Sequence, residues 1–270
     1  MLSDITIGQF FPGNSVLHRM DPRVKLALTF VYIIAIFIPR NWVGLLAAVV
    51  LLLFVALLSR LPIRLLIKSM KPVLPIILLT AIINLFYGQG EPLWQWWIFS
   101  ITAKGIVTAV FIAVRILCLI VGTSLLTYTT SPTTLTDALE RLLSPLKVIR
   151  VPVHEIAMMM TIALRFIPTL IEETEKIMSA QKARGADMES GGLMQRVRAL
   201  VPVLIPLFVS SFRRAYELAT AMECRCYQGG EGRTRLKQFC LHGHDVVSIA
   251  VMMAAVAVMI GCNAIFTAVI

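Results

Sequence analysis

The chain alternates between long apolar runs and short polar or basic segments. Residues 24–38 (VKLALTFVYIIAIFI) and 42–59 are apolar almost throughout, and the tripeptide Pro39-Arg40-Asn41 separates them. The other apolar runs cover residues 72–87, 105–127 and 246–270. Because a helix needs about 20 residues to cross a bilayer, these runs predict five transmembrane helices, the first of which is short and draws on its flanks.

The polar segments between these runs differ in charge. The N-terminal arm, the loop at 60–71 (RLPIRLLIKSMK) and the region 128–243 are basic, whereas the loops at 39–41 and 88–104 carry one cation each. Cytoplasmic loops of membrane proteins are enriched in Lys and Arg. This pattern predicts that the N-terminus and region 128–243 are cytoplasmic and that the C-terminus is outside. The cluster LWQWWIF predicts an anchor at the membrane interface.

The composition agrees with a membrane protein. Of the 270 residues, 58% are hydrophobic and 15% are charged, and the mean hydropathy is +0.83. The net charge of +10 follows from basic cytoplasmic loops, and acids interleave with bases across 128–243, so nucleic-acid binding is not expected. We predict an all-α polytopic membrane protein of about five transmembrane helices. Residues 1–127 contain an N-terminal arm and four of the transmembrane helices. Residues 128–243 contain long helices in the cytoplasm or on the membrane surface, and residues 244–270 contain the last transmembrane helix.

Two apolar segments interrupt the cytoplasmic region. Residues 156–171 contain Pro168, and residues 199–212 contain Pro202 and Pro206. Both segments look too short and too interrupted to span a bilayer. They are expected to lie along the membrane surface or against another protein's apolar face, with a buried helical core as the alternative. The three prolines are candidate hinges, or static kinks fixed by packing.

Each apolar segment continues into a polar helix that ends with an arginine between two small residues. The two triplets are Ala183, Arg184 and Gly185, and Cys224, Arg225 and Cys226. Basic residues suit a helix C-terminus, and Gly185 can take the left-handed conformation that often follows a helix. A single triplet of this kind would be explained by ordinary capping of a helix C-terminus. The planar guanidinium of arginine can form two parallel hydrogen bonds with one carboxylate. Two such triplets therefore predict two docking elements for two similar grooves.

Two other classes of function compete with this interpretation. A membrane metalloprotein would use a cluster of thiols and imidazoles, although its spacing is not a standard zinc pattern. Its candidate ligands are Cys224, Cys226, Cys240, His242 and His244. A stand-alone transporter would place ionisable groups along a path in the bilayer, but only Arg115 lies clearly inside a predicted span. The chain has no G-x-x-x-x-G-K-[ST] loop, so ATP hydrolysis is not expected of it.

With these motifs the chain resembles the EcfT family, the transmembrane T components of energy-coupling factor (ECF) transporters, which import vitamins and metals into bacteria and archaea. The resemblance covers essentially the whole chain. It begins with GQFFPGNSVLHRMDPRVKL at residues 8–26, which is similar to the N-terminal signature of the shared (group II) type, and it includes both arginine triplets. The second triplet departs from the commoner Ala-Arg-Gly form.

The resemblance implies the partners. Each arginine would dock into a groove of one ATP-binding cassette (ABC) ATPase subunit, near an acidic side chain, and the difference between the triplets is compatible with an ATPase heterodimer. ATP and magnesium would be bound by those subunits, and no cofactor is expected on this chain. A substrate-binding membrane S component would lie on an apolar platform in the plasma membrane of a bacterium. The platform residues are Met158, Met159, Met160, Leu164, Ile167, Leu204, Leu207 and Phe208.

Overall fold

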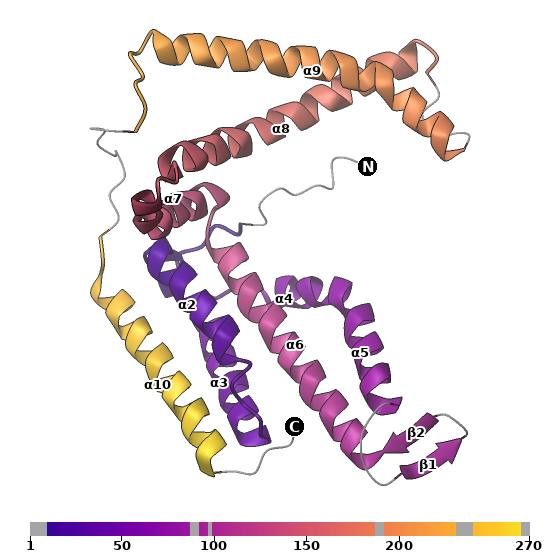
Figure 1. The fold of residues 1–270 in the computed structure, drawn as a ribbon, viewed down its shortest axis with the longest axis vertical. Coiled ribbons are helices and arrows are strands. Elements are labelled where there is room, and N and C mark those ends of the chain that lie inside the picture. The colour runs from indigo at the N-terminus through magenta and orange to yellow at the C-terminus, as the bar shows by residue number, and fades with distance from the viewer. Residues whose placement is uncertain (1–9, 87–91, 97–98, 187–191, 231–239, 266–270) are drawn as a thin grey trace. The chain divides into compact units, whose positions relative to one another are not determined.

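The computed structural model describes residues 10–86, 92–96, 99–186, 192–230 and 240–265 (Figure 1). Its contacts divide the chain into two compact units. Residues 8–139 and 237–270 form the first, which we call the bundle unit, and residues 1–7 and 140–236 form the second, the long-helix unit. The described part of the chain is almost entirely helical, which confirms the all-α polytopic class.

The bundle unit contains most of the elements. They are α1 (Val16–Arg19), α2 (Pro22–Ala35), α3 (Trp42–Ser59), α4 (Ile63–Met70), η1 (Lys71–Val73), α5 (Leu74–Phe86), β1 (Pro92–Trp96), β2 (Phe99–Thr102), α6 (Ala103–Thr129) and α10 (Gly243–Ile265). The boundary between the units falls inside α7 (Pro132–Leu143). The long-helix unit contains η2 (Ser144–Ile149), α8 (Val153–Ala183) and α9 (Leu193–Glu223).

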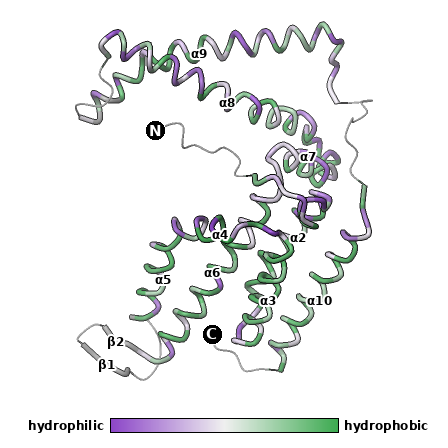
Figure 2. Tube along the Cα trace, turned by 180° about the vertical axis from the view of Figure 1, so that it is seen from behind, coloured by the Kyte–Doolittle hydropathy of each residue, from purple (hydrophilic) through white to green (hydrophobic). Residues whose placement is uncertain are grey.

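Six described helices are long and apolar enough to cross a membrane. They are α3, residues 63–85, α6, α8, residues 197–223 of α9, and α10. Figure 2 shows hydrophobic residues along most of α3, α5, α6 and α10. The bundle core contains Tyr32, Leu52, Cys118 and Met259, while large apolar side chains elsewhere on the same helices are exposed. Such outward apolar faces suit contact with lipid.

Helix α2 is short, as predicted, and it begins in the N-terminal flank of its apolar run. It has 14 residues, which span roughly 21 Å, and it ends at Ala35 rather than at residue 38. The chain then turns tightly, and Arg115 of α6 donates a hydrogen bond to the carbonyl oxygen of Pro39. The Arg115 guanidinium also lies 4.8 Å from the ring centre of Phe111. Arg115 therefore stabilises the turn after α2, which agrees with a structural role.

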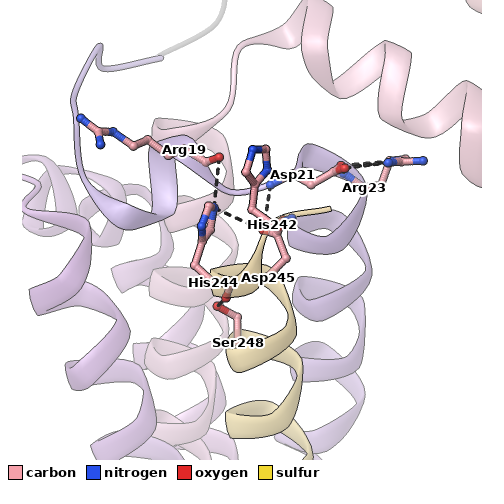
Figure 3. Close-up of polar contacts among 7 residues, drawn as sticks. All are labelled: Arg19, Asp21, Arg23, His242, His244, Asp245 and Ser248. Carbon is pink, nitrogen blue, oxygen red and sulfur yellow. Dashed lines mark hydrogen bonds and ion pairs between the residues drawn. The ribbon is translucent and has the colours of Figure 1, made fainter. Parts of the chain in front are cut away.

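One buried carboxylate joins the beginnings of α2 and α10 (Figure 3). Asp245 is fully buried, and its two oxygens accept the backbone N–H groups of Asp21, at 3.0 Å, and of His242, at 2.8 Å. Asp21 is the N-cap of α2, and His242 directly precedes α10. Because a helix N-terminus is electropositive, both helix ends stabilise the carboxylate. The two helices therefore start at the same end of the bundle and run in the same direction (Figure 1).

Both of the longer connections in the bundle unit contain regular secondary structure. Residues 60–71 were expected to be a loop but include α4, where Leu65 and Leu66 pack against the core while the cations remain on the other positions. Between α5 and α6, β1 and β2 form an antiparallel hairpin that pairs Trp96 with Phe99. Aromatic and β-branched residues favour strands, which explains the hairpin. The predicted interfacial anchor falls partly on residues 97–98, which lie outside the described residues.

The expectation that the apolar segments 156–171 and 199–212 are too short and too interrupted to span a bilayer was wrong as far as length and composition go. Each helix runs for 31 residues, with Pro168 inside α8 and Pro202 and Pro206 inside α9. Both are long enough to span a membrane by length and composition. Proline is tolerated inside a helix where a neighbouring helix supplies a partner for the backbone group that it frees.

Candidate functional site: two arginine motifs at helix ends

The first arginine motif ends α8 with a Schellman turn. Gly185 has a left-handed backbone with φ of +85°. Its N–H donates to the carbonyl oxygen of Lys182 at 3.0 Å, and the N–H of Ala186 donates to that of Gln181 at 3.0 Å. This pair of bonds defines the motif, with Arg184 as the last helical position and Gly185 as the residue beyond it. The prediction that Arg184 ends a helix and Gly185 caps it is confirmed.

The second motif has the same geometry at the end of α9. The N–H of Cys226 donates to the carbonyl oxygen of Glu223 at 2.8 Å, and the N–H of Tyr227 donates to that of Met222 at 3.1 Å. Cys226 takes the left-handed position, with φ of +54°. Arg225 therefore occupies the same place in its turn as Arg184 does in the first. The prediction that this helix also ends at its arginine triplet is confirmed, and the turn is closed at Cys226.

Both guanidinium groups are available for a partner. Arg184 and Arg225 are exposed, and within the described ranges neither side chain makes a hydrogen bond or an ion pair. A Schellman turn fixes the backbone on either side of each arginine while its side chain extends outward. An arginine on a rigid backbone, with an exposed and permanently charged guanidinium, is suited to insertion into an acidic groove.

Helix α9 holds the first motif in place through a proline. In a regular helix the carbonyl oxygen of Pro202 would accept the N–H of residue 206, but Pro206 has none. The freed carbonyl instead accepts a hydrogen bond from the side-chain amide of Gln181 in α8, at 3.3 Å. The backbone carbonyl of the same Gln181 closes the first Schellman turn. Gln181 therefore connects the Arg184 motif to the other long helix.

Helix α8 holds the second motif in a corresponding way. Tyr227, whose N–H closes the second Schellman turn, directs its hydroxyl to the sulfur of Met158 in α8 at 3.0 Å. Three residues later, Gly230 lies so close to His154 that a Cβ there would be 2.3 Å from its ring. His154 contacts Glu140 of α7 at 2.9 Å. The Arg225 motif is therefore tied to the start of α8.

A polar contact links the middle of the two long helices. Glu173 of α8 accepts hydrogen bonds from Ser210 and Arg214 of α9, and Arg214 also forms an ion pair with it. The contact is partly exposed, where a single ion pair contributes about 0–1 kcal/mol. Its three groups connect the middle of α8 with the middle of α9.

The predicted platform residues separate into two groups. Met159, Met160, Leu204 and Phe208 are exposed. The other predicted platform residues, Met158, Leu164, Ile167 and Leu207, are half-buried.

The exposed apolar stripe of α9 is also wider than predicted. It includes Ile205, Val209 and Phe212, which are 59%, 56% and 70% exposed. Ile205 and Val209 are four residues apart, as are Phe208 and Phe212, and this helical spacing is the signal that would have found them.

The structure places the candidate metal ligands in different units. Cys224 and Cys226 belong to the long-helix unit, whereas Cys240, His242 and His244 belong to the bundle unit. The described residues do bring His242, His244 and Asp245 within 4.8 Å of one another. Both oxygens of Asp245 already accept backbone N–H groups, and Arg23 and Lys25 contribute positive charge nearby. This arrangement is unfavourable for a cation.

An α-helical integral membrane protein with two equivalent arginine-bearing helix ends is thus defined, and comparison with known proteins gives its family. The family model described as "Cobalt transport protein" (CbiQ) matches residues 13–236. The transmembrane protein EcfT of the energy-coupling factor transporter from Ruminiclostridium cellulolyticum is 54% identical over 247 residues, which is 92% of each chain. EcfT from Clostridium kluyveri is 50% identical and covers 96% of this chain and 97% of its own. EcfT from Bacillus subtilis is 45% identical, with 94% and 97% covered.

The chain belongs to the EcfT family of transmembrane components of energy-coupling factor transporters. The resemblance based on the N-terminal signature and the arginine triplets is confirmed. The protein is therefore a membrane-embedded transporter component that works together with other subunits.

Proposed function

We propose that this chain couples the ATP-driven motion of two cytoplasmic ABC ATPase subunits to a substrate-binding S component, for uptake of a vitamin or another micronutrient. The observation that carries the proposal is the equivalence of Arg184 and Arg225. Each is exposed in the same position of a Schellman turn at the end of a 31-residue helix. Two equivalent grooves, one on each ATPase subunit, would each accept one of the two arginine motifs. The difference between Gly185 and Cys226 is compatible with an ATPase heterodimer.

The contacts between α8 and α9 suggest how motion is transmitted. When ATP and magnesium bind to the partner subunits and close them, the distance between their grooves changes. Arg184 and Arg225 follow, and the Gln181 and Tyr227 contacts carry each displacement to the other helix. Pro168, Pro202 and Pro206 are the positions where a helix bends at the lowest cost, since each lacks one backbone hydrogen bond.

The exposed apolar stripe of α9 and the methionines of α8 provide the platform for the S component. Met159 and Phe208 are 58% and 61% exposed. Methionine and large apolar side chains repack against differently shaped partners, which suits a surface that serves several S components. Movement of α8 against α9 would then tilt the S component in the membrane and open its substrate site to the cytoplasm.

The proposal places the protein in the plasma membrane of a bacterium, with the N-terminus and both arginine motifs in the cytoplasm. Asp245 binds the beginnings of both α2 and α10, which supports placing these two helix N-termini on the same side of the membrane. The chain itself is proposed to be non-catalytic and to hold no cofactor, because its sequence lacks a phosphate-binding loop and its partners would supply the nucleotide site.

The test is co-purification of the ATPase subunits from detergent-solubilised membranes. We expect the double substitution Arg184→Ala and Arg225→Ala to abolish or strongly weaken their retention. The matched control is the double substitution Arg165→Ala and Arg213→Ala, which removes two exposed arginines from the same two helices. Since lysine lacks the planar fork, replacing Arg184 and Arg225 by lysine should restore retention only in part.

The outcomes separate two readings of the motifs. Loss of the ATPases in the first variant but not in the control supports docking through the two arginines. Equal retention in both variants would show that the arginines are helix caps and that coupling uses another surface. Failure of the wild-type chain to retain any ATPase would overturn the proposed function as a whole.

A further inference from the structure

The bundle unit contains two adjoining cavities of opposite character. One has a volume of about 310 Å³ and is lined mainly by apolar side chains, among them Leu28, Leu51 and Val251. The other has a volume of about 350 Å³ and is lined by polar and basic groups, among them His18 and Arg19. The two cavities share Met20, Lys25 and Thr129. A ligand with a polar head and an apolar tail matches this pair.

Lys25 stands at the junction of the two cavities. Only 6% of the residue is exposed, and its ammonium donates to the carbonyl oxygen of Thr129 at 3.1 Å and to the hydroxyl of Thr130 at 3.0 Å. An ammonium has three donors, so one remains for a ligand. A buried cation held in position by two neutral acceptors is a built site for an anionic oxygen.

The charged side chains around the polar cavity carry one net positive charge, from Arg19, Arg23 and Lys25 against Asp21 and Asp245. Asp21 forms an ion pair with Arg23 at 2.7 Å, and Asp245, which accepts two backbone N–H groups, also attracts Lys25. Among the described residues Arg19 forms no ion pair. The N-termini of α2 and α10 add electropositive backbone. His18, His242 and Cys240 line the polar cavity, and His244 lines the apolar one.

We propose that these cavities bind one anionic phospholipid, with its phosphate against Lys25 and Arg19 and one acyl chain between α2, α3 and α10. Basic pockets between transmembrane helices are known binding sites for anionic lipid head groups. The apolar cavity lies among helices whose other faces already carry exposed apolar side chains suited to lipid, such as Phe30 and Leu53. The lipid would fill the space between α2 and α10 beside the Asp245 contact and hold the two helix beginnings together. This inference does not depend on the ATPase partners.

The experiment is native mass spectrometry of the full chain purified in detergent and titrated with phosphatidylglycerol, phosphatidylcholine and free glycerol 3-phosphate. We expect one phosphatidylglycerol to bind at least about tenfold more tightly than phosphatidylcholine. Free glycerol 3-phosphate should compete poorly, because it lacks the acyl chains. Equal binding of phosphatidylcholine would overturn the role of the cations, and equal binding of glycerol 3-phosphate would overturn the role of the apolar cavity.

Two variants test the site itself. Lys25→Met removes the ammonium but keeps the length of the side chain, and Leu28→Trp fills the apolar cavity while leaving every charge in place. Both should lose the bound phosphatidylglycerol. The controls are Lys104→Met, an exposed lysine at the start of α6, and Phe30→Trp, on the exposed side of the same helix as Leu28. Retention of the lipid by Leu28→Trp would contradict the proposal even if Lys25→Met fails to fold, and ATPase co-purification from both variants reports separately on the proposed function.

Discussion

At the residue scale, the two arginine motifs differ in how well their sequences suit the same turn. Gly185 takes its left-handed conformation without steric cost, whereas Cys226 places a Cβ in a region that costs an L-residue about 1–2 kcal/mol. Glycine is therefore the better suited of the two residues at the third position of the triplet. The second motif keeps the position of its arginine at the expense of local stability.

This difference predicts the effect of one substitution. Cys226→Gly should stabilise the end of α9 by about 1 kcal/mol, because glycine removes the strain at positive φ. The midpoint of thermal unfolding in detergent should rise by a few degrees. Cys226→Ala removes the thiol but keeps the Cβ, so it should leave the midpoint nearly unchanged. A rise with Cys226→Ala equal to that with Cys226→Gly would show that the thiol, and not the backbone, is responsible.

At the scale of the elements, prolines do not interrupt α8 and α9 but create contacts between them. Pro206 frees the carbonyl oxygen of Pro202, and Gln181 binds it from the other helix. The crossing therefore includes a hydrogen bond that a regular helix would not offer. The same proline therefore removes a hydrogen bond within α9 and adds one between the two helices.

A double-mutant cycle measures this contact. Gln181→Ala should cost about 1 kcal/mol in the wild-type background, as a typical hydrogen bond does. In a Pro206→Ala background the cost should be smaller, because the new N–H of residue 206 satisfies the Pro202 carbonyl. Denaturant unfolding of the detergent-solubilised protein provides the free energies, with Gln195→Ala as an exposed control on α9. An unchanged cost in the two backgrounds would contradict the assignment of this acceptor.

At the scale of the whole molecule, residues far apart in the sequence fix the ends of the bundle. Asp245 joins the N-terminal arm to the last helix at one end. At the other end, Asn41 donates to the carbonyl oxygen of Cys262 at 2.7 Å, and Asn263 donates to that of Ile38 at 2.6 Å. Helix α10 is thereby held to the α2–α3 pair along its length, although some 200 residues of chain separate them.

The Asp245 contact gives a prediction about the bundle unit. Asp245→Asn keeps the shape of the side chain but replaces one acceptor oxygen by a donor, which then faces a backbone N–H. We expect a loss of about 1–3 kcal/mol, the cost of leaving a buried polar group unpaired. Hydrogen exchange should accelerate most at whichever of the two amides, Asp21 or His242, faces the new donor, because the remaining oxygen still accepts from the other. Glu217→Gln, which removes one exposed charge, is the control, and unchanged exchange at both amides would contradict Asp245 as their acceptor.

The sequence by itself determined the membrane class, most of the apolar helices and the place of both arginines at helix ends, because these depend on local composition, periodicity and capping residues. It also contained the family signature. Only the tertiary structure decided that α2 ends at Ala35, that Gln181 binds the carbonyl oxygen that Pro206 frees and that Cys226 closes the second turn. These features depend on partners such as Arg115 and Gln181, which lie tens of residues away along the chain and become neighbours only after folding.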